Sequence, residues 1–80
     1  MHESQAIRRL LADGWQYSVR QMEFRGDRFQ PCLVFRRNGV ETRMFSSLTY
    51  ASEAAAWNWC DSWAHRALLW TDNPDQGVIG

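Results

Sequence analysis

Apolar residues recur along the chain with two different periods, and these periods predict the secondary structure. Between Trp15 and Leu48 they alternate with polar residues, which is typical of strands with one buried face. Between Leu48 and Trp70 they recur at every third or fourth position, the spacing of one helical face. A shorter helical stripe occupies residues 4–12. The pattern therefore predicts two helices that flank a group of strands.

The later helix contains most of the aromatic bulk. Trp59, Cys60 and Trp63 fall on its apolar stripe, so we expect both of these tryptophans to lie in the core. Thr49 or Ser52 is expected to cap its first turn. The asparagine and proline at positions 73 and 74 end the pattern, so residues 71–80 are predicted to be a loosely ordered tail and the core to span about residues 4–70.

Three strands are predicted, over residues 15–24, 29–36 and 40–48. The Asn38-Gly39 pair favours a two-residue hairpin turn between the last two. The order predicts an α+β fold: a short N-terminal helix, a three-stranded antiparallel meander and a long C-terminal helix packed on one sheet face. The other face is left to solvent or to a partner.

Two residue patterns within the strands predict local irregularities. The apolar phase of the first strand changes at Met22 and Phe24, which predicts a bulge beyond Gln21. Pro31 lacks an amide donor, which favours a place at a sheet edge or at the start of its strand.

Length and composition limit the classes of protein that need to be considered. Eighty residues, of which 45% are apolar, make one domain spanning residues 1–80. The sequence has no apolar stretch long enough to cross a membrane and no visible signal peptide, so a cytoplasmic protein without a membrane partner is expected.

No motif for catalysis or for a cofactor is apparent. The two histidines, His2 and His65, and the two cysteines, Cys32 and Cys60, do not have the spacing of metal ligands. Cys60 lies on the predicted buried face, where a thiol is not activated, and we expect both cysteines to stay reduced. The sequence therefore predicts a protein that is not an enzyme and holds neither a metal nor a cofactor.

The basic residues are unusual because all nine are arginine. Arg20, Arg43 and either Arg36 or Arg37 are predicted on adjacent strands, where they would form a stripe on the open sheet face. Such a stripe suits phosphates or the acidic surface of another protein. A solvated face on which nearby acids balance the arginines is the other interpretation, and the formal net charge of zero fits it.

A second candidate surface lies on the later helix. Trp57, Ala64 and Leu68 share a side of this helix away from the main stripe. An exposed tryptophan there is typical of a binding hot spot. The alternative is that the N-terminal helix covers this side of the later helix.

Residues 48–57, Leu-Thr-Tyr-Ala-Ser-Glu-Ala-Ala-Ala-Trp, follow the third predicted strand and open the helix. Glu53, Ala54 and Trp57 have the spacing found at the strand-to-helix junction of the AP2-like arm-type DNA-binding domains of phage integrases, and the segment resembles that junction. The resemblance implies DNA recognition by the three-stranded sheet. Arg20, Arg36 and Arg43 would then be the contacts.

The leading hypothesis is a non-catalytic module that binds another protein. Small proteins of this kind are common in phages and mobile elements, where they inhibit or adapt host machinery, anti-CRISPR proteins included. This association rests on size and type and not on particular residues. The alternative hypothesis is DNA binding through the arginines of the sheet. The identity of the partner and the oligomeric state stay open.

Overall fold

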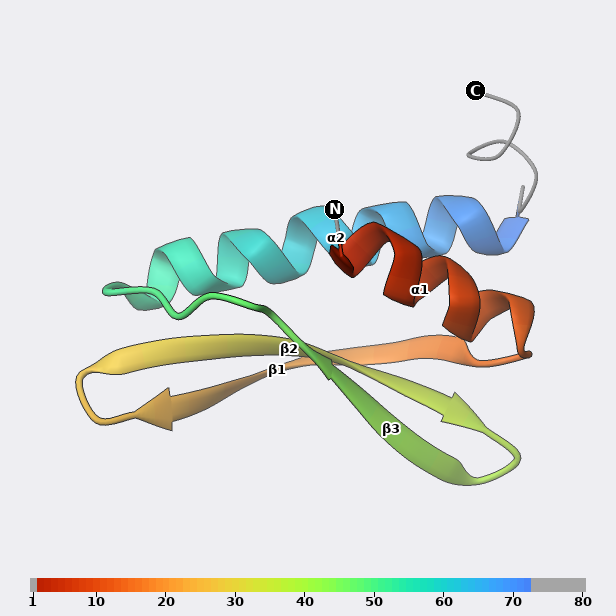
Figure 1. Ribbon diagram of the computed structural model, residues 1–80, viewed down its shortest axis with the longest axis horizontal. Coiled ribbons are helices and arrows are strands. Elements are labelled where there is room, and N and C mark those ends of the chain that lie inside the picture. Colours follow the sequence, from red (N-terminus) through yellow and green to blue (C-terminus); the bar gives the residue numbers. More distant parts are fainter. Residues whose placement is uncertain (1, 73–80) are drawn as a thin grey trace.

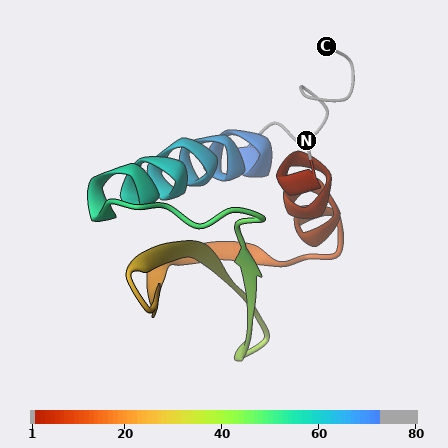
Figure 2. The same ribbon diagram turned by 60° about the vertical axis from the view of Figure 1, so that its left-hand side comes forward.

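The computed structural model describes residues 2–72 and has the predicted α+β order. Three antiparallel strands form one sheet in the order β1-β2-β3, and both helices lie on the same side of it (Figures 1 and 2). The elements are α1 (His2–Ala12), β1 (Gln16–Arg25), β2 (Arg28–Arg37), β3 (Val40–Phe45) and α2 (Glu53–Asp72). The predicted α+β class and meander are confirmed.

Local signals account for the ends of both helices. Gly14, with φ of 91°, takes the left-handed conformation that closes α1, and the Trp15 amide donates to the Leu10 carbonyl across this end. Ser52 caps α2, because its Oγ accepts from the Ala55 amide at 3.2 Å. Helix α2 continues to Asp72, beyond the predicted end, and the rest of the predicted tail lies outside the described residues.

The Asn-Gly hairpin is confirmed. Asn38 and Gly39 both have positive φ, 52° and 81°, as a two-residue turn of this twist requires. The turn sets the register of the last two strands, from the Arg37–Val40 pair to the Cys32–Phe45 pair. Strand β3 ends at Phe45, three residues earlier than predicted.

The end of β2 that holds Pro31 lies at an edge of the sheet, as expected, because β3 pairs with β2 only from Cys32 to Arg37. This residue lies within the central strand, opposite Met22 of β1. Its missing amide donor is replaced locally: the Gln30 side-chain amide donates to the Ser46 carbonyl at 3.1 Å, and the Ser46 amide donates to the Pro31 carbonyl at 3.0 Å. The pairing of β2 with β3 ends beside Pro31, at the Cys32–Phe45 pair, so the proline does not interrupt the hydrogen bonds between these two strands.

The bulge of β1 is nearer the start of the strand than predicted. Tyr17 pairs with Phe35 and Val19 with Val34, which leaves Ser18 as the extra residue. The bulge exchanges the two faces of the strand. Tyr17 therefore faces the helices, whereas Val19 faces away from them, and this exchange decides where the arginine at position 20 points.

The core lies between the sheet and the helices. On β2, Leu33 and Phe35 are completely buried beneath α2 and Ile7 of α1. The part of α2 that meets them consists of small residues, which are Ala56, Cys60, Ala64 and Ala67. Small side chains allow the helix backbone to approach the sheet closely.

The tryptophans of α2 flank this small-residue stripe instead of forming it. Trp59, Trp63 and Trp70 are partly buried and pack against the core from the side. The expectation that Trp59 and Trp63 are core residues therefore holds only in part. Their rings are too large for the space directly between helix and sheet, so they fill its margin.

Candidate functional site

The sheet face turned away from both helices is the first candidate site, and we call it the open face. Alternation along the strands and the observed register decide which side chains lie on it. Among them are Val19, Gln21 and Glu23 from β1, Cys32, Val34 and Arg36 from β2, and Glu41, Arg43 and Phe45 from β3.

The centre of the open face is apolar. Cys32 and Val34 are completely buried although no helix covers them. Arg43 of β3 donates from Nε to Oε1 of Gln21 at 3.0 Å, and this bond passes over the central strand. Val19 and Phe45 flank the same two residues and remain 46% and 36% exposed. An apolar centre is therefore accessible from solvent at its sides.

Ion pairs surround this centre. Arg36 Nε lies 3.6 Å from Glu41 Oε2, and Arg43 reaches the same carboxylate at 3.9 Å. At the other end of the face, Arg25 and Glu23 pair at 2.9 Å. All of these side chains are substantially exposed, so they contribute little to stability. The open face has both signs of charge.

The predicted position of Arg20 on the open face is wrong. Because of the bulge, Arg20 pairs with Leu33 and points to the helix side of the sheet. Its NH1 donates to Oδ1 of Asp61 on α2 at 2.6 Å, and its guanidinium lies 4.4 Å from the centre of the Trp57 ring. This arginine connects β1 to α2.

Of the two alternatives on β2, Arg36 lies on the open face and Arg37 does not. The Arg37 guanidinium stacks 4.6 Å from the Trp15 ring centre and donates to the Asp13 carbonyl at 2.7 Å. The structure therefore brings Arg36 and Arg43 together and separates both from Arg20 and Arg37. No stripe of three arginines forms on the open face.

The second predicted surface, along Trp57 and Leu68 on α2, is interrupted. Trp57 is partly covered by Arg20, and its Nε1 donates to Glu53 Oε2 at 3.2 Å. Ala64 between them is buried in the core. Leu68 is 54% exposed and is followed by Leu69 at 45%. Only the Leu68 end of this surface is open to a partner.

The sequence did not reveal one role of the arginines, which is to stack on tryptophan rings. Four of the five tryptophans have a guanidinium within 4.4–4.6 Å of the ring centre; the pairs are Arg8–Trp70, Arg20–Trp57, Arg37–Trp15 and Arg66–Trp63. A planar guanidinium stacks on an indole and still donates hydrogen bonds at its edge, which an ammonium group does less well. The available signal was the presence of five tryptophans in a chain whose nine basic residues are all arginine.

The two thiols are structural. Cys60 Sγ lies 3.6 Å from the Cys32 carbonyl oxygen, and both cysteines are free and buried. Burial raises the pKa of the Cys60 thiol to about 11, with Cys32 adding to the effect, and burial also raises the pKa of Cys32. A thiol held in its protonated form is a poor nucleophile and a poor metal ligand.

Because of this thiol, we expect the protein to lose stability in alkaline solution. In the unfolded chain Cys60 ionises near pH 8.5, whereas in the folded protein it stays protonated to about pH 11. The stabilisation is complete below the lower value and is lost as the pH rises through the upper one. At about 1.4 kcal/mol per pKa unit, the loss is on the order of 3 kcal/mol.

Urea unfolding between pH 7 and 10.5 measures this effect. The Cys60→Ala variant should show a clearly shallower decline with pH than the natural sequence. The remaining decline comes from Cys32 and from Tyr17, whose pKa burial also raises. An unchanged slope in Cys60→Ala would contradict the assignment.

Among residues 2–72, no three His, Cys, Asp or Glu side chains come close enough together to hold a metal ion. Neither described helix combines the length and apolar character that crossing a bilayer demands.

Comparison with protein-family models, curated proteins and solved structures finds no match for this chain. The resemblance of residues 48–57 to the AP2-like junction stays a prediction. In the structure, Glu53 begins α2 and Trp57 bonds to it one turn later, so both residues serve the start of this helix.

Proposed function

We propose that this protein is a non-catalytic module that binds another protein through the open face. The observation that carries the proposal is the apolar centre of Cys32 and Val34, which is accessible at its sides through Val19 and Phe45 and is surrounded by ion pairs. An apolar centre with a polar rim is the anatomy of protein interfaces. A partner with a complementary apolar patch and charges of both signs fits this face.

DNA binding has less support than it had from the sequence. Arg20 is held by Asp61 and Trp57, and Glu41 lies within 4 Å of both Arg36 and Arg43. A phosphate that approached these two arginines would meet the carboxylate as well. The suggestion that the partner belongs to the machinery of a phage host stays a prediction.

The test compares two double variants as bait in a lysate of the source organism. Val19→Asp with Phe45→Asp places charge at the two accessible sides of the apolar centre of the open face. Leu68→Asp with Leu69→Asp makes the same change at exposed residues of α2. Both changes affect exposed side chains, so both variants should fold, which melting temperatures check.

Quantitative mass spectrometry of the captured proteins gives the result. We expect one partner to be retained by the α2 variant at the level of the natural sequence, and to fall at least about tenfold with the open-face variant, since a buried unpaired charge is costly. Loss of the partner with the α2 variant alone would move the site to Leu68. Capture that disappears on nuclease treatment and falls steeply with salt would favour DNA.

A further inference from the structure

The outer edge of β3 is free to pair with another strand. Arg37 and Val40 close the two-residue turn and form a hydrogen-bonded pair, so pairing alternates from there along the strand. The main-chain groups of Glu41, Arg43 and Phe45 therefore point away from β2. Within residues 2–72, no other segment bonds to them. Such an edge is a template for an additional strand.

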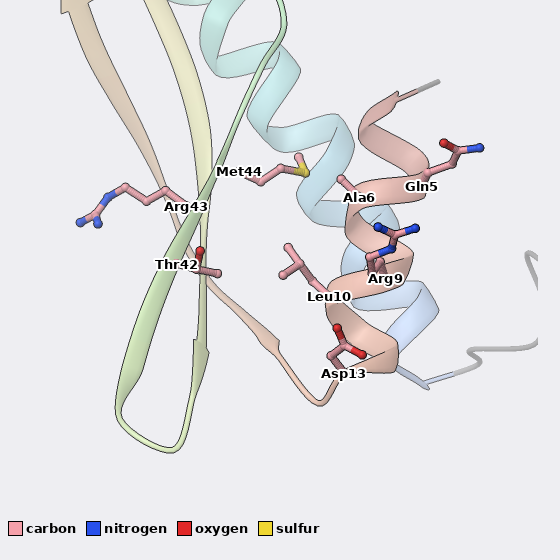
Figure 3. A pocket seen from close by; sticks show the side chains of 8 residues that line it. All are labelled: Gln5, Ala6, Arg9, Leu10, Asp13, Thr42, Arg43 and Met44. Atoms are coloured by element: carbon pink, nitrogen blue, oxygen red, sulfur yellow. The ribbon is translucent and has the colours of Figure 1, made fainter.

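A groove of about 410 Å³ lies along this edge, between β3 and α1 (Figure 3). Ala6 and Leu10 reach into it from the helix, and Thr42 and Met44 reach into it from the strand. Arg43 points to the opposite side of β3, toward the open face. The groove is therefore apolar at its floor and has a free strand edge as one wall.

The rim of the groove holds one acidic residue, Asp13, and one arginine whose guanidinium has no partner among the described residues. Eight of the nine arginines contact a carboxylate, a tryptophan ring or another hydrogen-bonding group, as described above and, for Arg28, through its bonds to Thr49. Arg9 on α1 is exposed and has no such partner among the described residues. A guanidinium in this position favours a carboxylate on whatever occupies the groove.

We propose that this groove binds an extended segment of another protein, which adds to β3 as a fourth strand. Main-chain hydrogen bonds to Glu41, Arg43 and Phe45 provide affinity that is independent of the bound sequence. Alternate side chains of the segment turn into the groove. One is apolar and packs on Leu10 and Met44, and another, two residues away, is acidic and meets Arg9. The site goes beyond the open face, which lies on the other side of the sheet.

A second copy of the chain fits the groove less well. Pairing of two β3 edges would bring the α1 helix of each copy toward the other copy, into the space that the groove provides. A single extended segment needs only that space. A dimer is accordingly an outcome that overturns the proposal.

Synthetic peptides provide the probe. The first is a fluorescein-labelled octapeptide with leucine and glutamate two residues apart and threonine elsewhere. The second has lysine in place of glutamate. The third repeats the first with alternate amides N-methylated, which removes the donors of a strand edge and leaves the side chains. Binding to the full chain is followed by fluorescence anisotropy, with peptide and protein each taken to millimolar concentration.

We expect the glutamate peptide to bind about tenfold more tightly than the lysine peptide, and the N-methylated peptide to lose binding. The Arg9→Glu variant should reverse the preference between the first two. Failure of the glutamate peptide to bind at millimolar concentration overturns the proposal, and so does equal binding of the N-methylated peptide.

Two variants at one position test the strand edge from the side of the protein. Arg43→Pro removes an amide that points outward, so the pairing of β3 with β2 is kept. Arg43→Ala removes the same side chain and keeps the amide. We expect Arg43→Ala to bind the glutamate peptide within about twofold of the natural sequence and Arg43→Pro to lose it. Equal binding by both folded variants contradicts the proposal.

Melting temperatures show whether both variants are folded. If Arg43→Pro is not folded, the N-methylated peptide alone tests the strand edge. Sedimentation velocity covers the remaining outcome. A dimer that Arg43→Pro converts to a monomer would show that a second copy occupies the edge. These results are independent of the open-face test, because the peptide binds or fails to bind whatever Val19 and Phe45 contact.

Discussion

Replacement of Phe35 by alanine should lower the free energy of unfolding by about 3–5 kcal/mol. Phe35 is completely buried in the central strand, and Tyr17 packs edge-on to it with 6.1 Å between ring centres. Its removal leaves a cavity beneath α2 that neighbouring side chains cannot fill. Since small domains have a total stability of only about 5–15 kcal/mol, much of the variant should be unfolded near physiological temperature. Urea unfolding followed by circular dichroism measures the loss.

Phe24→Ala is the matched control. Phe24 also lies in the sheet and packs edge-on to another phenylalanine, Phe29, but it is 67% exposed. We expect its truncation to cost no more than about 1 kcal/mol. Similar losses in the two variants would show that the core is not centred where α2 meets β2.

The second large effect is expected from enlarging the small-residue stripe of α2. Ala67→Leu inserts three carbon atoms where the helix meets the core, and overpacking of this kind costs about 1–3 kcal/mol. Ala67 is completely buried, whereas Ala55 in the same helix is exposed. Ala55→Leu makes the same chemical change, and alanine and leucine have similar helix propensities, so it should be close to neutral.

Thermal unfolding of the two leucine variants gives the comparison. The expected difference corresponds to a melting temperature lower by roughly 5–20 °C for Ala67→Leu than for Ala55→Leu. If Ala67→Leu were the more stable, space would exist between helix and sheet that the tight packing described above does not allow.

The sequence predicted the order of elements because each element has strong local signals. The three-and-four spacing identifies α2, and Asn38-Gly39 can close only a narrow range of turns. The Ser52 cap and the glycine at the end of α1 act within one or two turns of the chain. These features depend on near neighbours, which a sequence displays directly.

The positions of the site residues were harder to predict because they depend on one inserted residue. A change of phase in β1 was visible at Met22 and Phe24, but apolar spacing does not show where along a strand the phase changes. The bulge lies at Ser18 instead of beyond Gln21, so the side chains between these two places are on the opposite face from the one assumed, whereas Met22 and Phe24 are on the assumed face. For this reason Arg20 faces α2 and Val19 lies on the open face, each opposite to its predicted position.

The interpretation of the core was also incomplete. Trp59 and Trp63 were assigned to the buried centre of α2 because they fall on its apolar stripe together with Cys60. The structure places alanine and cysteine there and tryptophan beside them. The separation between helix and sheet decides which sizes fit, and this distance is a tertiary property that periodicity does not contain.

The stacked arginines also make the fluorescence of individual tryptophans a local probe of the structure. Trp70 with Arg8 lies where α1 meets α2, Trp57 with Arg20 where α2 meets β1, and Trp15 with Arg37 beside the link from α1 to β1. Indole emission responds to a nearby cation and to water, so separation of any one junction changes the signal of its own tryptophan. Chains that retain a single indole can therefore show which contact opens first during unfolding, with no added dye.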